Sequence, residues 1–183
     1  LACGVTGQIM LMAAGYDLGS KNEKFIKDRK LEVFIKPAQD YLGQYGSKII
    51  YPVDMAYEQE GKRAEIAIEQ LPAAELYLDI GKKTIEIFRK ELLTAGTIFV
   101  NGPAGVYENP LFEDGTRDIW TAIAEASAYS VIGGGDTVSA AQKFIDTNGI
   151  NYVCTAGGAM VRFLSGESMP LIEAMKNSYA KSA

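Results

Sequence analysis

The sequence predicts an α/β fold in which a parallel β-sheet carries helices on both faces and a small β-hairpin is inserted. Short β-rich runs alternate with helical periods along the chain. Three of these runs end in glycine-rich segments, and residues 55–70 alternate around a turn at Glu60-Gly61. Strands that alternate with helices are joined by right-handed crossovers, which place parallel strands in one covered sheet.

The first third of the chain predicts two helices and a short strand. Residues 5–14 carry apolar residues at helical spacing and stop at Gly15, a residue suited to a helix C-terminus. Ser20 is suited to the N-cap of a second helix, which we expect to be interrupted at Pro37. Residues 49–54 form an apolar run that ends in an aspartate, which is typical of a short buried strand.

The middle of the chain has a different pattern. The alternation of residues 55–70 around Glu60-Gly61 predicts the β-hairpin, and residues 76–80 predict one more short strand. Residues 82–94 carry a stripe of apolar side chains at helical spacing, which predicts an amphipathic helix.

The rest of the chain repeats one unit, a strand that leads through a glycine-rich junction into a helix. The strands are expected at 97–100, 129–132 and 151–154, and the second of the following helices is expected to run to Asn148-Gly149. Pro170 is suited to the first turn of a last helix. This regular alternation predicts a three-layer Rossmann-like parallel sheet.

The three junctions are the main functional signal of the sequence. We call them the glycine rim; they are Asn101-Gly102-Pro103-Ala104-Gly105, Gly133-Gly134-Gly135-Asp136-Thr137 and Thr155-Ala156-Gly157-Gly158-Ala159. In a parallel sheet all strand-to-helix loops emerge at the same edge, where ligands bind. Glycine lets the backbone approach a ligand, and the unpaired N–H groups that begin each helix bind anions.

Each junction taken alone has a plainer interpretation. The second can be a tight turn with Asp136 as the helix N-cap. Gly157-Gly158 can serve close packing of a strand against a helix, and Asn101-Gly102-Pro103 is a common turn composition. Three junctions in a row on one edge favour a phosphate-binding or nucleotide-binding rim. Neither G-x-x-x-x-G-K-[ST] nor G-x-G-x-x-G is present, since Val138 stands where the last glycine of the second motif would be.

Three side chains near the rim have suitable chemistry. Asp136 lies beside backbone N–H groups that would hold phosphates, so it is suited to bind a Mg²⁺ ion on a nucleotide. The Thr137 hydroxyl can donate to a phosphate oxygen. Glu108 can accept hydrogen bonds from ribose hydroxyls, although a solvated surface glutamate is an equally good interpretation.

Composition excludes several other classes of function. The 183 residues suit one domain, and a net charge of −5 with no dense basic tract argues against a nucleic-acid partner. The chain has no histidine, which excludes Ser-His-Asp triads, Cys-His dyads and zinc sites built on histidine. Apolar stretches too short for a membrane, and two unpaired-looking cysteines, Cys3 and Cys154, predict a cytoplasmic protein without a membrane partner.

The ordered motifs resemble the C-terminal, nucleotide-binding domain of phosphoglycerate kinase, in a form closest to archaeal members. The blocks that carry the resemblance are Ala13-Ala14-Gly15-Tyr16-Asp17-Leu18-Gly19, Tyr51-Pro52-Val53-Asp54, Asp79-Ile80-Gly81-Lys82-Lys83-Thr84, Asn101-Gly102-Pro103-Ala104-Gly105-Val106-Tyr107-Glu108 and Val131-Ile132-Gly133-Gly134-Gly135-Asp136-Thr137. They cover nearly the whole chain in the family's order.

The resemblance implies an ATP-dependent kinase of glycolysis and gluconeogenesis, which transfers a phosphoryl group between ATP and 3-phosphoglycerate. It implies Mg-ATP or Mg-ADP as ligand, with Mg²⁺ on Asp136. Residues expected to hold the nucleotide are Gly4 and Val106 at the adenine, Glu108 at the ribose, and Asn101, Gly133, Gly134, Gly135, Asp136 and Thr137 at the phosphates. Gly134, Gly135 and Gly158 are the expected catalytic positions, since helix N-termini there stabilise the transferring group.

The sequence departs from the family pattern at three positions. Cys3-Gly4 replaces Gly-Gly, Ala156 replaces a glycine, and Lys82 replaces a proline. We expect residues 1–183 to be the C-terminal nucleotide-binding domain, truncated at its N-terminus, with the 3-phosphoglycerate domain absent and no activity from this chain alone. The alternatives are a non-catalytic nucleotide-binding module of the same fold and an unrelated sugar-phosphate binder.

Overall fold

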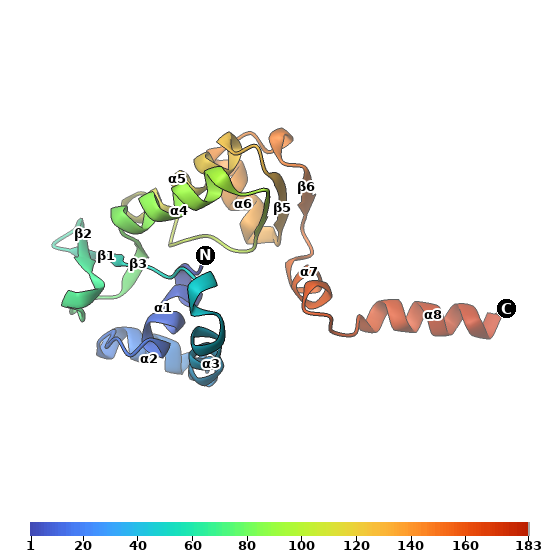
Figure 1. Cartoon of the computed structure of the whole chain (residues 1–183), viewed down its shortest axis with the longest axis horizontal. Helices are drawn as coiled ribbons and strands as arrows, with labels where there is room; N and C mark the ends of the chain where they lie inside the picture. Colours follow the sequence, from blue (N-terminus) through green and yellow to red (C-terminus); the bar gives the residue numbers. More distant parts are fainter. Residues whose placement is uncertain (183) are drawn as a thin grey trace.

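Two separate β-sheets organise the chain (Figure 1). The computed structural model describes residues 1–182. A parallel sheet has the strand order β4-β5-β6 and comprises β4 (Thr97–Val100), β5 (Tyr129–Gly133) and β6 (Tyr152–Cys154). An antiparallel sheet has the order β2-β1-β3 and comprises β1 (Asp54–Gln59), β2 (Lys62–Ala67) and β3 (Tyr77–Ile80). The predicted α/β class and the hairpin insertion are confirmed.

The parallel sheet is flanked by helices and buries one face in the largest core. Ile98 and Ile132 belong to strand positions that share this face, because Ile98 pairs with Ser130, two residues before Ile132. The helices packed there are α4 (Lys82–Thr94), α5 (Asp114–Glu125) and α6 (Gly135–Phe144). The opposite face carries exposed Phe99 and Tyr152, and α7 (Gly157–Leu164) covers it near Gly133.

Three helices form a second layer of the molecule beside the antiparallel sheet (Figure 1). They are α1 (Gly4–Ala13), α2 (Ser20–Asp28) and α3 (Ile35–Tyr45). Ile9, Ile26 and Ala38 form their shared core, one from each helix. Because α1 begins at Gly4, this layer brings the start of the chain beside the Pro103–Ala104 segment of the glycine rim.

Three predicted boundaries are wrong. The second helix ends at Asp28 because the chain turns through Lys30 at positive φ, and Pro37 lies in the first turn of α3, where its missing N–H is not needed. Residues 49–53 are not a ladder strand; β1 begins only at Asp54. The helix expected to run to Asn148-Gly149 ends at Phe144, and residues Thr147–Gly149 form a separate 3-10 turn.

The remaining elements are connectors and the last helix. Further 3-10 turns lie at Glu32–Phe34, Gly46–Lys48, Ile68–Gln70 and Pro110–Phe112. The last helix, α8 (Pro170–Ser182), begins at the predicted proline and extends away from the rest of the molecule (Figure 1). Across residues 1–182, none of the helices combines the length and the apolar character that crossing a bilayer would need.

Candidate nucleotide-binding site

The three junctions of the glycine rim meet in space. The Gly102 N–H donates to the Thr137 hydroxyl at 2.7 Å, which joins the first junction to the second. Gly134 and Gly157 join the second to the third, since a Cβ on Gly157 would lie 2.7 Å from the Gly134 Cα. Gly134 has a φ of +103°, a conformation that favours glycine. The predicted rim is therefore one continuous backbone surface at the carboxyl edge of the sheet.

The exposed part of the rim consists of two helix starts. Gly135 and Asp136 begin α6, Gly158 lies in the first turn of α7, and all three are exposed. Neither Gly135 nor Gly158 has an atom close enough to contact an added Cβ, so their backbone faces open space. First-turn N–H groups of a helix lack intrahelical partners and attract anions. These positions therefore form the part of the rim that can approach a phosphate.

The other predicted phosphate contacts are less open. Thr137 is buried, and its hydroxyl oxygen already accepts the Gly102 N–H. Gly133 is buried beneath α7, because a Cβ there would lie 2.9 Å from the Met160 sulfur. Asn101 is exposed, and its Oδ1 lies close to both glycines of the Gly134–Gly157 contact. Thr137 thus holds the first two junctions together from within the rim, and Asn101 lies against the contact between the second and the third.

A cavity of about 570 Å³ adjoins the first junction on the side of α1. Gly4 and Val106, predicted to flank an adenine, both line it. The Gly4 N–H donates to the Ala104 carbonyl at 3.0 Å, and the Val106 N–H donates to the Leu78 carbonyl at 2.8 Å. Apolar walls with a few backbone polar groups are typical of sites for a flat aromatic base. The structure brings these two predicted residues together.

Glu108 lies on the exposed loop that follows the cavity. The preceding peptide is held by Lys143 of α6, whose Nζ donates to the Tyr107 carbonyl at 2.6 Å and to Glu113 Oε2 at 2.8 Å. Burial raises the pKa of Tyr107, and the carboxylates of Glu108 and Asp136 raise it further. Both carboxylates therefore act on the same tyrosine.

The fit of a magnesium ion depends on Asp136, the one acidic residue among residues 133–137. Within residues 1–182 no cluster of three or more acidic, cysteine or histidine side chains could hold a metal by itself. Magnesium is commonly bound through one or two carboxylates together with substrate phosphates. The exposed Asp136 carboxylate at the start of α6 fits that arrangement.

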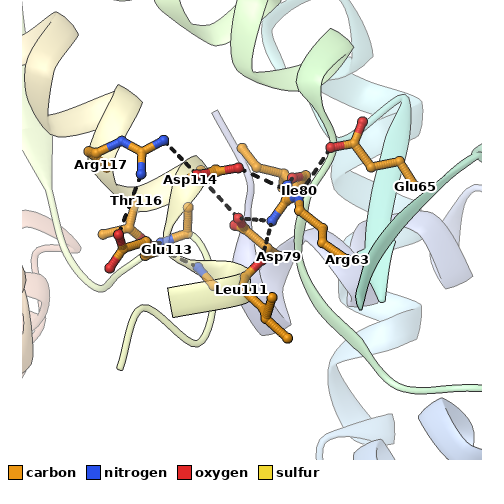
Figure 2. A network of polar contacts seen from close by, with 12 residues as sticks. Arg63, Glu65, Asp79, Ile80, Leu111, Glu113, Asp114, Thr116 and Arg117 are labelled. Carbon is orange, nitrogen blue, oxygen red and sulfur yellow. Dashed lines mark hydrogen bonds and ion pairs between the residues drawn. The ribbon is translucent and has the colours of Figure 1, made fainter. Parts of the chain in front are cut away.

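Sequence reasoning missed a polar network beneath the loop of residues 101–113 (Figure 2). Its centre is Arg63 of β2, which binds Asp79 of β3 at 2.9 Å. Burial raises the pKa of Asp79 to about 6, against the lowering effect of the Gly115 N–H and of Arg63. Asp79 stood within a recognised motif, but nothing in the local pattern around Arg63 indicates a partner sixteen residues away.

Similarity to known proteins extends over nearly the whole chain. A family model described as phosphoglycerate kinase matches residues 1–167. The phosphoglycerate kinase of Methanothermus fervidus is 41% identical over 182 residues, which is 100% of this chain and 44% of that protein. That of Methanopyrus kandleri is 41% identical over 172 residues, 94% of this chain and 42% of that protein.

Solved structures agree with this result. The crystal structure of phosphoglycerate kinase from Pyrococcus horikoshii matches with a TM-score of 0.86 at 38% identity, covering 98% of this chain and 45% of that one. The structure of phosphoglycerate kinase from Coxiella burnetii matches with a TM-score of 0.78 at 34% identity, covering 94% and 44%. The chain belongs to the phosphoglycerate kinase family. It spans less than half the length of these relatives.

Two of the phosphoglycerate kinase motifs meet away from the rim and hold the fold. Asp54, the last residue of Tyr51-Pro52-Val53-Asp54, accepts the N–H groups of Lys83 and Thr84 at 3.0 and 2.9 Å. It thereby caps α4 from another element, as an N-cap side chain would. Gly81 is required there, because a Cβ would overlap the Asp54 carboxylate. These motifs therefore explain architecture more than ligand binding.

Two of the departures from the family pattern, Cys3 and Ala156, lie at the site's borders, and the third, Lys82, lies away from it. Cys3 lines the cavity beside Gly4, and burial raises the pKa of its thiol to about 11, so it is a neutral wall residue. Ala156 precedes α7 as its N-cap, and its N–H donates to the Cys154 sulfur at 3.3 Å. Lys82 begins α4, where a proline would also fit.

Proposed function

We propose that this chain is the Mg-ATP/ADP-binding part of a phosphoglycerate kinase. The reaction is phosphoryl transfer between ATP and 3-phosphoglycerate, with the 3-phosphoglycerate site in the part of the relatives that this chain does not match. The observation that carries the proposal is the contact of three glycine-rich junctions, two of them helix starts, on one sheet edge beside an apolar cavity. That arrangement offers one end to phosphates and the other to a base.

Each predicted residue then has a place along the nucleotide. Gly4 and Val106 enclose the base, and Glu108 accepts from the ribose hydroxyls. The N–H groups at Gly135 and Gly158 donate to the phosphate oxygens, and they stabilise the charge that develops on the transferring group. The Gly134 N–H donates to the Cys154 carbonyl at 2.9 Å, so Gly134 contributes by letting the backbone approach the phosphates. Bound magnesium neutralises phosphate charge, and Asp136 is the side chain that would hold it.

A second candidate is a nucleotide-binding module without catalysis. It keeps the same nucleotide contacts but lacks a second substrate held in line for phosphoryl transfer. The two candidates agree on nucleotide binding and differ only in turnover. A coupled kinase assay on the purified chain, with 1,3-bisphosphoglycerate and ADP, has one decisive outcome: ATP formation would overturn the second candidate and the expectation that this chain is inactive alone.

The nucleotide site itself is tested by calorimetry with ADP, with and without Mg²⁺. We expect ADP to bind, and we expect Mg²⁺ to strengthen binding in the wild-type protein. Asp136→Asn should remove most of that gain, which we estimate as about tenfold in Kd, or ~1.4 kcal/mol. Asp40→Asn in α3, another exposed aspartate that pairs only with Lys36 one turn away, is the matched control.

Two outcomes would contradict the proposal. If the wild-type protein binds no ADP at millimolar concentration, the rim is not a nucleotide site. If Asp136→Asn and the wild-type protein gain equally from Mg²⁺, Asp136 does not hold the ion.

A further inference from the structure

The network around Arg63 is more extensive than the packing of a hairpin needs (Figure 2). Only 13% of the arginine side chain is exposed, although it is charged. Its partners are Asp79 Oδ2 at 2.9 Å, the Leu111 carbonyl at 3.2 Å, the Ile80 carbonyl at 2.8 Å, Glu65 Oε1 at 3.1 Å and Asp114 Oδ2 at 3.7 Å. A planar guanidinium can satisfy carboxylates and carbonyls at once, whereas an ammonium group cannot hold this fork geometry.

These partners support the segment 101–113, which we call the nucleotide loop, on both sides of residues 106–110. At its C-terminal end, Arg63 binds the Leu111 carbonyl directly. Nearer its N-terminal end, the loop backbone rests on Asp79, because a Cβ on Gly105 would lie 2.5 Å from Asp79 Oδ1. Asp79 is in turn held by Arg63, so one side chain fixes the floor and the far end of the loop.

The residues between these two supports are the ones proposed to contact adenosine. The Val106 N–H binds the carbonyl of Leu78, the residue next to Asp79 in β3. Glu108 follows, and its side chain makes no hydrogen bond or ion pair with any of residues 1–182, so its position depends on the loop backbone. The phosphate end of the rim is built differently, from the starts of α6 and α7, although α6 also binds the nucleotide loop through Thr137 and Lys143.

A buried ion pair is not required for stability, since apolar residues of similar volume often serve as well. Burial raises the pKa of Asp79, so ionising this carboxyl inside the protein is unfavourable by itself. We therefore infer that the network, which keeps the charges of Arg63 and Asp79 buried, serves to fix the local geometry. The geometry fixed here is that of the nucleotide loop.

We propose that Arg63 is a positioning residue that fixes the adenosine-binding half of the site by holding the nucleotide loop at Gly105, through Asp79, and at Leu111. This inference rests on the proposed nucleotide function. It assigns the support of residues 106–110 to β2 and β3, in addition to the links that Thr137 and Lys143 of α6 make to the same loop. Loss of Arg63 should weaken ligands that contain adenosine and leave a ligand that contains only phosphates unaffected.

The first test compares two ligands by calorimetry, ADP and inorganic tripolyphosphate, each with Mg²⁺. Arg63→Met should weaken ADP about tenfold, a change of ~1.4 kcal/mol in binding, and change tripolyphosphate less than about twofold. Arg63→Lys should lie between, because it keeps a positive charge beside Asp79 but loses the fork. As a control, Arg89→Met removes an arginine on the surface of α4 that pairs with Glu125, and it should change the binding of neither ligand.

A second measurement needs no nucleotide. Hydrogen exchange reports the N–H groups of Val106, Asn109 and Phe112, which are bonded to the carbonyls of Leu78, Val106 and Asn109. Arg63→Met, and more weakly Arg63→Lys, should speed exchange at these three amides relative to those of β5. If Arg63→Met does not fold, Arg63→Lys and the double variant Arg63→Met/Asp79→Asn, which leaves no unpaired buried charge, carry the same comparison.

The outcomes distinguish the two proposals. Unchanged exchange in the nucleotide loop, or equal weakening of ADP and tripolyphosphate, overturns the role of Arg63. Faster exchange in that loop with no ADP binding by the wild-type protein supports the clamp and overturns the nucleotide function.

Discussion

The hydroxyl of Thr137 accepts the N–H of Gly102 at 2.7 Å, which ties the start of α6 to the loop after β4. The side chain is 1% exposed, so water cannot replace the bond. Thr137→Val keeps the shape and removes the acceptor, leaving the Gly102 N–H unpaired. We expect a loss of about 1–3 kcal/mol in the free energy of unfolding.

Urea unfolding measures this loss, and Thr137→Ser is the matched control because it keeps the hydroxyl. Equal stability of the valine and serine variants would show that the bond does not hold the rim together.

The contact between Gly134 and Gly157 gives a second prediction. Gly157→Ala places a methyl group 2.7 Å from the Gly134 Cα, whereas Gly158→Ala meets no atom within 4 Å. We expect Gly157→Ala to lose about 1–3 kcal/mol of stability, as overpacked sites do. Gly158→Ala should be neutral or slightly more stable in thermal unfolding. It should nevertheless weaken ADP binding, because its methyl group would occupy space next to the proposed phosphate position.

The cap that Asp54 provides to α4 gives a third prediction. Asp54→Ala removes the acceptor of the Lys83 and Thr84 N–H groups, and the loss of a helix cap costs about 0.5–2 kcal/mol. Asp54 is buried, so we expect the upper part of that range. Denaturant unfolding measures it, with Glu86→Ala on the exposed face of α4 as control. A similar effect of both variants would argue against the cap.

The buried carboxyl of Asp79 gives a dependence on pH. Burial raises its pKa from 3.8 to about 6. Between these values the folded protein holds a proton that the unfolded chain has released, so raising the pH through this window weakens folding. We expect the unfolding free energy of the wild-type protein, relative to Asp79→Asn, to fall between about pH 4 and about pH 7. A rising difference would mean that Arg63 outweighs burial.

Local pattern predicted most elements that have a regular period and clear ends. The hairpin around Glu60-Gly61 and the helix at 82–94 appear as expected, because alternation and helical spacing are local signals. Residues 49–53 failed as a strand because membership of a sheet depends on a partner, which an apolar run does not specify. The prediction that Pro37 interrupts the second helix was wrong, because that helix ends at Asp28 and Pro37 lies in the first turn of α3.

The sequence predicted candidate residues for the site but not the hydrogen bonds that join them. Gly4, Val106 and the glycine rim were found from motifs, and the structure brings them to adjoining places. The bonds that fix them, from Thr137 to Gly102 and from Arg63 to Leu111, join residues 35 and 48 positions apart. Such pairs leave no periodic signal in one sequence, so they become visible only in three dimensions.

The meeting of Gly134 and Gly157 also has an electrostatic consequence. It sets the N-terminal ends of α6 and α7 side by side, and each such end acts as about half a positive charge. The two partial positive charges repel each other. An anion bound between the two helix ends is attracted to both and offsets that repulsion. Folding and anion concentration are then coupled by mass action. The rim would then stabilise the folded protein more strongly when an anion is bound to it, in addition to forming a binding surface.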